Sequence, residues 1–141
     1  MTDRTPRGES TGDLLGQIVR RQRHIWAHAA APLGVSPHQV RALRVICEAP
    51  IRPGTLAERL HIAPRSATDV VDALEQGHLI VRAPDPGDRR AVVLDATPEG
   101  RDTLAQVLTA RDRAVADWLD RLSEHDRAEL HRILGLLTAD D

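Results

Sequence analysis

The sequence predicts a mainly α-helical protein with one small two-stranded β-ribbon, on three observations. Apolar residues recur every three or four positions through most of the chain, which is the period of an amphipathic helix. Proline follows serine or threonine at Ser36-Pro37 and Thr97-Pro98, a pairing typical of helix starts. One segment breaks the period, because two short apolar runs, 79–83 and 91–96, flank a turn rich in proline, glycine and aspartate.

Length and composition are those of a small protein with a buried core. The chain has 141 residues, of which 41% are hydrophobic and 28% are charged. It contains no long apolar run and no apolar leader, so we expect no membrane association and a cytoplasmic location. Cys47 is the only cysteine, which excludes an internal disulfide. A formal net charge of -2 argues against a protein that coats polyanions non-specifically.

The first half of the chain is predicted to hold two helices after a tail. Residues 1–11 are polar and carry no apolar period, which favours a flexible tail. A helix is expected from about residue 13 to about residue 31, ended by Pro32 and Gly34. Ser36 then caps a second helix, whose predicted buried face holds Val40, Leu43, Ile46 and Cys47.

Two shorter helices and the ribbon follow. Thr55 is expected to cap a short helix, and Pro64 to occupy the first position of the next. Gly77 lies where a left-handed residue is expected to end that helix. Two short helices followed by a hairpin are typical of a winged helix-turn-helix, in which one helix enters a DNA groove and the hairpin lies beside it.

The last third of the chain is predicted to be helical again. Thr97-Pro98 begins a helix of roughly 25 residues, which at about 1.5 Å per residue is longer than a compact winged domain needs. Ser123 and Asp126 then form a capping-box-like start for a final helix with leucines along one side.

The helices at the two ends carry apolar stripes that the central segment cannot cover. We therefore expect residues 12–35 and 98–141 to form dimerisation helices around a DNA-binding domain at residues 36–97. A two-fold dimer would present two reading helices to successive major grooves and bind a near-palindromic site. The alternative is a helical bundle within one chain.

Other function classes find little support in the sequence. It contains no HExxH or CxxC motif and no glycine-rich phosphate loop, so we expect no catalysis and no cofactor. It has two tryptophans and neither phenylalanine nor tyrosine, whereas single-strand and RNA readers stack bases on exposed aromatic rings. Double-stranded DNA is the expected nucleic acid. A winged-helix module that binds protein instead is the alternative.

Four segments, in this order, resemble the MarR family of bacterial transcriptional regulators. They are Thr55-Leu-Ala-Glu-Arg-Leu60, Val71-Asp-Ala-Leu-Glu-Gln-Gly-His-Leu-Ile-Val-Arg82, Asp85-Pro-Gly-Asp-Arg-Arg90 and Thr97-Pro-Glu-Gly100. The resemblance covers nearly the whole chain and implies a homodimeric regulator, with repression of transcription and release by a small effector as the expected mode. It also implies that Arg90 enters the minor groove, that Asp88 aims its guanidinium and that Arg89 contacts phosphate or the groove edge. Alternatively, the charged residues of the hairpin only stiffen its turn.

On the predicted reading helix, Arg65, Ser66 and Thr68 lie in the first turn and a half, which normally enters the major groove. Asp69 departs from the family, and we expect its carboxylate to pair with Arg65 rather than accept from a cytosine amino group. Ala63 also departs from the family, because the usual hydroxyl cap before this helix is missing.

Phosphate contacts are expected from other arginines. Arg52 and Arg59 are the predicted anchors, and the backbone at the start of the second helix, residues 36–39, offers further donors.

The effector site is predicted from few residues. Trp26, His24 and His28 are the candidates to line a site for a small aromatic or phenolic compound, which the family resemblance implies as the effector class; the alternative for Trp26 is a place in the dimer core. His24 and His28 have a spacing that suits zinc, but no third ligand follows from the sequence, and we expect no metal site. A regulator responding to metal through these histidines, or to oxidants through Cys47, is the alternative; Cys47 lies on a predicted buried face, which favours an inert thiol.

Overall fold

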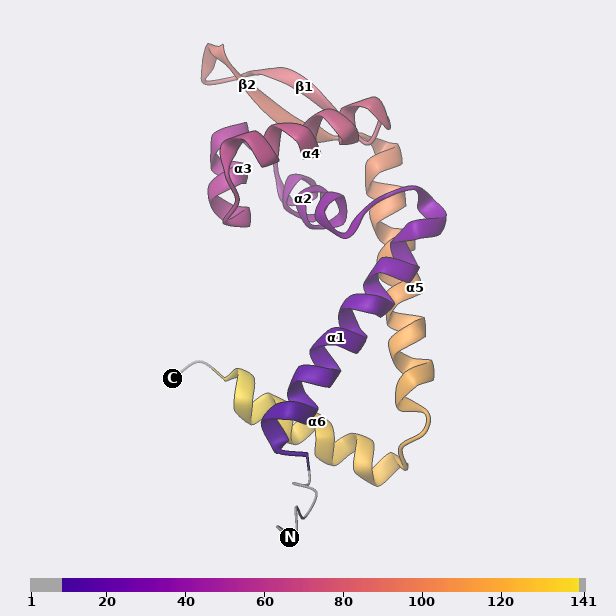
Figure 1. The fold of residues 1–141 in the computed structure, drawn as a ribbon. Coiled ribbons are helices and arrows are strands. Elements are labelled where there is room, and N and C mark those ends of the chain that lie inside the picture. Colours follow the sequence, from indigo (N-terminus) through magenta and orange to yellow (C-terminus); the bar gives the residue numbers. More distant parts are fainter. Residues whose placement is uncertain (1–8, 140–141) are drawn as a thin grey trace, which may run out of the picture.

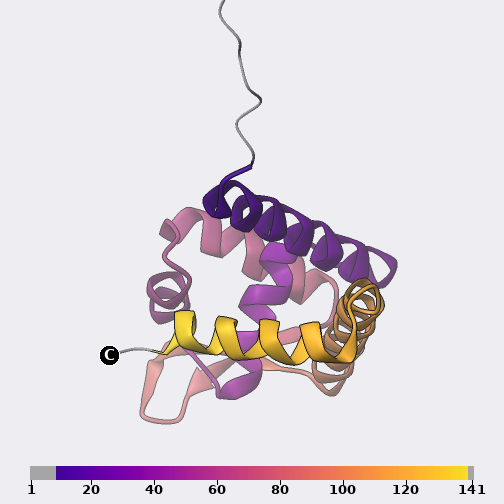
Figure 2. The same ribbon diagram turned by 90° about the horizontal axis from the view of Figure 1, so that it is seen from below.

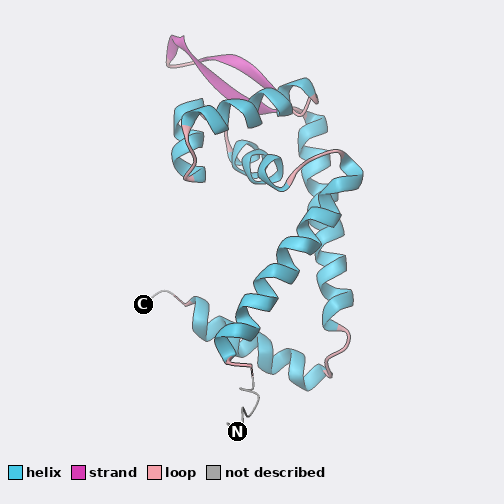
Figure 3. Cartoon of the chain, viewed as in Figure 1, coloured by secondary structure: helices cyan, strands magenta, loops and turns pink. Residues whose placement is uncertain are grey.

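A computed structural model describes residues 9–139 of the chain. It confirms a mainly helical protein with a single two-stranded ribbon (Figure 3). The elements in chain order are α1 (Thr11–Ala30), a short 3-10 helix (Ala31–Leu33), α2 (Pro37–Glu48), α3 (Pro53–Leu60), α4 (Pro64–Gln76), β1 (Ile80–Asp85), β2 (Asp88–Ala96), α5 (Pro98–Leu119) and α6 (Glu124–Thr138). Residues 1–8 of the predicted tail lie outside the described residues.

The molecule has a compact head and two long helices that extend from it. Helices α2, α3 and α4 and the ribbon form the head, while α1 and α5 leave it side by side and then diverge (Figure 1). Helix α6 turns back from the far end of α5. In Figure 1 it crosses the end of α1, but the view from below shows the two helices apart (Figure 2).

The hydrophobic core lies inside the head. Its largest fully buried side chains are Leu43, Ile46, Leu56, Leu74, Ile80, Leu94, Val40, Val71 and Val107. Burial of each such side chain contributes about 1.5–3 kcal/mol. The core is closed by α5, because Leu104 and Val107 pack into the same cluster.

Helix starts follow the caps that the sequence predicts, with one exception. The hydroxyls of Ser36, Thr97 and Ser123 each accept a hydrogen bond from a backbone N–H in the first turn. Helix α3, however, begins two residues before Thr55, at Pro53, and has no side-chain cap. Proline at the first helical position presets φ and has no N–H to satisfy, so the helix starts there without a hydroxyl.

The end of α4 also differs from the prediction. Gly77 has φ -78°, and the left-handed residue is the next one, His78, with φ 59°. The N–H of His78 donates to the carbonyl of Glu75, and the N–H of Leu79 to that of Leu74. These are the two hydrogen bonds of a Schellman motif, shifted one residue along the chain from the glycine.

The ribbon, which we call the wing, is antiparallel and longer than predicted. Its register pairs Ile80 with Ala96 and Pro84 with Val92, and Pro86-Gly87 forms the turn. A short third segment joins it, since Ile51 and Leu94 exchange two backbone hydrogen bonds of 3.0 and 2.8 Å. The base of the wing is therefore anchored to the linker between α2 and α3.

Apolar side chains remain exposed along both end helices. On α1 they are Leu14, Leu15, Ile18 and Val19, and on α6 they are Ile133, Leu134, Leu136 and Leu137. Helix α6 buries no residue. Within residues 9–139, no helix is both long and apolar enough to cross a bilayer.

Candidate nucleic-acid interface

Helix α4 presents a polar face to solvent. Its buried residues are Ala67, Val71 and Leu74, whereas Arg65 and Thr68 are exposed. Ala63 precedes the helix and provides no side-chain cap, as expected. The hydroxyl of Thr68 donates to the carbonyl of Pro64 at 3.1 Å, which leaves its oxygen free to accept from a ligand.

The expected ion pair between Arg65 and Asp69 does not form. Both side chains are exposed, and no ion pair involves either of them within the described part of the chain. An exposed pair of this kind gains little over two hydrated charges, so solvent competes successfully with it. The carboxylate of Asp69 remains free on the polar face of α4.

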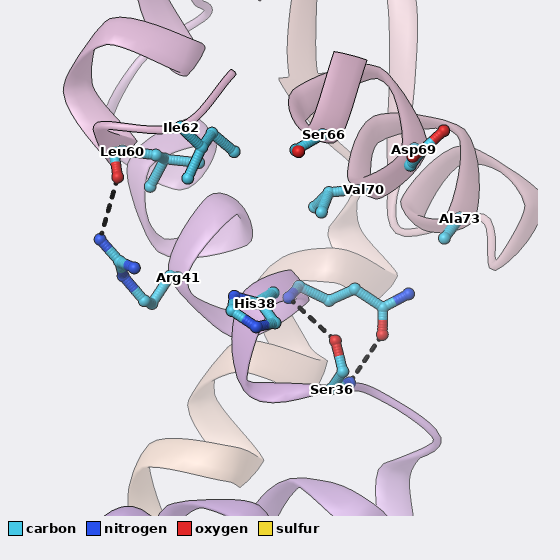
Figure 4. Close-up of a pocket in the computed structure, with 10 residues that line it drawn as sticks. Ser36, His38, Arg41, Leu60, Ile62, Ser66, Asp69, Val70 and Ala73 are labelled. Atoms are coloured by element: carbon cyan, nitrogen blue, oxygen red, sulfur yellow. Dashed lines mark hydrogen bonds between the residues drawn. The ribbon is translucent and has the colours of Figure 1, made fainter. Parts of the chain in front are cut away.

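A surface hollow of about 550 Å³ separates α4 from the start of α2 (Figure 4). It is lined by Ser36, His38, Gln39, Arg41, Leu60, Ile62, Ser66, Asp69, Val70 and Ala73. Arg41 donates to the carbonyl of Leu60 at 3.3 Å and so satisfies the end of α3.

The start of α2 offers fewer donors than expected. The N–H of Gln39 donates to the Ser36 hydroxyl at 3.2 Å, and the N–H of Ser36 donates to the Gln39 side chain at 2.6 Å (Figure 4). Pro37 has no N–H. Because this capping box uses most of the available donors, His38 is the remaining backbone donor that could meet a phosphate in this turn.

The tip of the wing carries two exposed arginines. Arg89 and Arg90 are exposed, and neither forms an ion pair within residues 9–139. Asp88 contacts Arg90 differently from the expectation, because its carboxylate accepts from the backbone N–H of Arg90 at 3.1 Å rather than from the guanidinium. The turn is thereby ordered while both guanidinium groups stay available.

Asp85, at the other side of the wing turn, pairs with Arg52 instead of a wing arginine. Its Oδ2 lies 2.6 Å from Nη2 and 2.8 Å from Nε of Arg52, and its Oδ1 accepts from the Gly87 N–H at 2.8 Å. The hydrogen bond from Gly87, with that from Arg52, lowers the pKa of Asp85 below its ordinary value. Arg52, predicted as a phosphate anchor, is thus engaged by the wing, and Arg59 pairs with Glu48 at 2.7 Å.

Arg82 is a residue that sequence patterns did not single out. It lies on β1 and pairs with Asp72 at 2.6 Å and with Glu75, both on α4. The hydrogen bond to Asp72 raises the pKa of Arg82 above its ordinary value. These contacts tie α4 to the wing and offset two negative charges on α4. In the sequence, the feature that could have pointed to this contact is the pair of acidic residues three positions apart near the end of α4, Asp72 and Glu75.

A second cavity, of about 400 Å³, opens between α1 and α5. It is lined by Arg21, His24, Ile25, His28, Ala29, Ala114, Asp117, Trp118 and Arg121. The rings of His24 and His28 meet edge to face with centroids 4.3 Å apart. Trp26 does not line this cavity; it packs against the core, with the Arg111 guanidinium 4.8 Å from its ring centroid.

Neither a metal cluster nor an activated thiol occurs in the described part of the chain. No group of three His, Cys, Asp or Glu side chains gathers within residues 9–139 in a geometry that could hold a metal ion. Cys47 is partly buried, and this burial raises the pKa of its thiol, with Asp95 adding to the rise and Arg101 opposing it. A thiol that stays protonated is a poor redox sensor.

Comparison with known proteins agrees with this arrangement. The sequence model of the MarR family matches residues 33–91, which include the helix-turn-helix and most of the wing. A putative transcriptional regulatory protein for the hcr operon of Thauera aromatica is 36% identical over 95% of this chain and 84% of its own length. The HTH-type transcriptional repressor MdtR of Bacillus subtilis is 31% identical over 74% of this chain and 68% of its own.

A solved structure extends the likeness to the whole fold. The transcriptional repressor CouR, bound to a 23-mer DNA duplex, superimposes with a TM-score of 0.72 at 27% identity, covering 92% of this chain and 93% of CouR. The likeness includes the long end helices as well as the head, because it spans nearly the full length of both chains.

Proposed function

The chain belongs to the MarR family of transcriptional regulators, and from this we propose that it is a homodimer that binds a near-palindromic site in double-stranded DNA. The observation that carries the proposal is the wing tip, where Arg89 and Arg90 are exposed and form no ion pair with any residue that the structure describes, beside an exposed polar face of α4. Guanidinium groups held this way suit the negative potential of a DNA groove. With DNA as its target, the protein acts in the cytoplasm.

We assign the contacts to DNA by element. Arg65, Ser66 and Thr68 at the start of α4 read bases in the major groove, where Arg65 reaches guanine, the Ser66 hydroxyl donates or accepts, and the Thr68 hydroxyl accepts. Arg90 enters the minor groove, Arg89 meets phosphate or the groove edge, and Asp88 holds the turn through the Arg90 backbone. Arg59 contacts phosphate once it leaves Glu48, which an exposed pair allows at little cost.

The exposed apolar faces of α1 and α6 support a homodimer. Leu136 and Leu137 are each 67% exposed, and within residues 9–139 helix α6 buries no residue. Amphipathic helices left uncovered in this way are stable in a protein when a second surface covers them. A second copy supplies such a surface and places two α4 helices about 34 Å apart, one turn of B-form DNA. Residues 12–35 and 98–141 are then the dimerisation helices, and residues 36–97 the DNA-binding domain.

We further propose that a small effector acts at the cavity between α1 and α5. The cavity lies between the dimerisation helices. Its lining includes the guanidinium groups of Arg21 and Arg121, the carboxylate of Asp117, the imidazoles of His24 and His28 and the side chain of Trp118. Such a lining suits an aromatic acid or a phenol, which would alter the angle between α1 and α5 and thus the spacing of the two heads. Repression relieved by the effector is the mode that this arrangement favours.

Gel-shift titration of the full-length dimer with a duplex selected from random sequence tests the proposal. Replacement of Arg90 by alanine should weaken binding at least tenfold, as expected for the loss of one specific arginine contact, and should leave the dimer intact. Arg113→Ala is the matched control, because it removes an exposed arginine from α5, far from the head. Affinity should also fall steeply with salt, since phosphate contacts release counterions.

Two results would contradict the proposal. If the wild-type protein selects no duplex, it is a protein-interaction module rather than a DNA reader. If Arg90→Ala and Arg113→Ala bind equally well, the wing does not contact DNA.

A further inference from the structure

The wing is anchored at several levels, and the anchors become fewer toward its tip. At its base, Arg101 of α5 pairs with Asp95 at 3.3 Å. One step farther out, Leu94 is fully buried and exchanges hydrogen bonds with Ile51. Arg82, which is paired with Leu94 across the ribbon, holds the wing to α4 through Asp72.

The outermost buried side chain of the ribbon is Val93, which pairs with Ala83, and beyond this pair the ribbon leaves the core. Pro84, Val92 and the turn at Pro86-Gly87 are exposed. A two-stranded ribbon without a packed face is only marginally stable in water. Among the described residues, the outermost side-chain link to the helical body is the pair between Arg52 and Asp85.

The position of Arg52 explains its reach. Its neighbour Ile51 is fixed to Leu94, so the backbone of Arg52 lies alongside the wing near the level of Arg82. Ile51 pairs with the edge of β2 that faces away from β1, so the Arg52 side chain reaches across β2 to Asp85 on β1. Two of its nitrogens contact the same carboxylate oxygen. The Asp85 side chain is only 17% exposed.

The same carboxylate also shapes the turn. Its second oxygen accepts from the Gly87 N–H, so Asp85 links Arg52 directly to the turn that precedes Arg89 and Arg90. We propose that Arg52 is a positioning residue for DNA binding, which acts through Asp85 to hold the wing tip at the angle that aims Arg90 into the minor groove. This inference rests on the proposed function and replaces the phosphate-anchoring role predicted for Arg52.

The two roles of Arg52 differ in their dependence on Asp85. A phosphate anchor acts on its own, and removal of the nearby Asp85 charge would then tighten DNA binding by reducing repulsion of phosphates. A positioning residue needs its partner, so loss of either side chain should weaken binding to a similar extent, and loss of both should add nothing.

The experiment measures affinity of the full-length protein for a duplex that the wild type selects from random sequence. The variants are Arg52→Gln, Asp85→Asn and the double variant, each with Arg90 present and with Arg90→Ala. Arg132→Gln is the matched control, because Arg132 forms an exposed two-nitrogen pair with Glu129 away from the head, on the side of α6 that faces away from Leu137. Thermal unfolding is followed for every variant, and the midpoints should stay near that of the wild type because the Arg52 side chain is half exposed and the pair lies outside the core.

The expected result is a threefold to tenfold loss of affinity, roughly the effect of breaking one coupled pair, for Arg52→Gln and for Asp85→Asn. The double variant should bind DNA with the same affinity as the single variant that binds less tightly. Neither substitution should lower the affinity of the Arg90→Ala protein further. Arg132→Gln should bind as the wild type does.

Other outcomes overturn the inference. Unchanged or tighter binding by Asp85→Asn does so, as does a further loss when Arg52→Gln is added to Asp85→Asn or to Arg90→Ala, because Arg52 then contacts DNA by itself. If Arg90→Ala weakens binding while the Arg52 and Asp85 variants do not, the inference fails and the proposed function stands. If the wild type selects no duplex, the proposed function fails as well.

Discussion

Gly100 passes directly over the backbone carbonyl of Leu79. A Cβ at Gly100 would lie 2.9 Å from the carbonyl carbon of Leu79 and even closer to its oxygen. The same oxygen accepts a hydrogen bond from the Thr97 N–H at 3.0 Å. The Thr97 hydroxyl donates to the backbone carbonyl of His78 at 2.7 Å and accepts from the Gly100 N–H, which caps α5. The start of α5 is thus closed against the residue that precedes the wing, and only glycine fits the contact.

Gly100→Ala should therefore destabilise the protein. The atom it would meet belongs to the backbone and has no flexible end that could move away, so we expect a loss near the upper end of the about 1–3 kcal/mol typical of overpacking. Thermal and denaturant unfolding of the full-length protein measure it. Gly54→Ala is the matched control, since a Cβ added at Gly54, the second residue of α3, meets nothing within 4 Å; alanine there should raise stability by at most the about 0.5–1 kcal/mol gained in a helix interior. Equal stability of the two variants would show that the contact between Gly100 and the Leu79 carbonyl has room for a methyl group.

Cys47 should behave as a packed thiol. Burial raises its pKa, so at any pH between neutrality and its raised pKa a smaller fraction is thiolate than in a free cysteine, and the nucleophilic form is scarce. Alkylation by iodoacetamide at pH 8 should be slower than that of free cysteine and should speed up in denaturant. Alkylation faster than that of the free amino acid would instead support the oxidant-responsive alternative.

The end helices should separate when a charge is placed on the apolar side of α6. Leu137 is exposed in the single chain, and we expect it to be buried in the dimer. Replacement by glutamate removes about 1.5–3 kcal/mol of burial from each copy and adds a charge that the interface must desolvate. The dimer dissociation constant, measured by analytical ultracentrifugation, should rise at least tenfold. Ala128→Glu adds the same charge to the opposite side of α6 and should leave the dimer intact; dissociation by both variants would indicate a general loss of helix.

The sequence predicts most of the fold because its signals are local. Caps such as Ser36 and Thr97, and the apolar spacing of each helix, depend on residues only a few positions away. The errors arise where two local signals compete. Thr55 is a good cap, but Pro53 begins the helix first, and the left-handed position falls on His78 although Gly77 is the better residue for it.

The candidate site was less predictable, because its contacts join residues far apart in sequence. Arg52 and Asp85 are 33 positions apart, and Arg82 reaches back to Asp72 and Glu75 on another element. No local pattern tells which acid an arginine will choose, and exposed pairs differ little in free energy. The expectation that Asp69 pairs with Arg65 failed for this reason, because helical spacing permits the pair but does not require it.

Asp69 should consequently contribute to base selection. Its free carboxylate lies on the exposed face of α4 near Ser66, where it can accept a hydrogen bond from a cytosine amino group. At a DNA sequence without cytosine in this position, the carboxylate gains no such bond and only repels the phosphates. In Asp69→Asn the amide pairs well with adenine, so selection from random sequence should shift one position of each half-site away from cytosine, and non-specific affinity should rise. Glu58→Gln removes the same charge from an exposed position of α3 and should raise non-specific affinity without changing the selected bases. Identical selected sites for wild type and Asp69→Asn would show that the carboxylate stays in solvent and reads nothing.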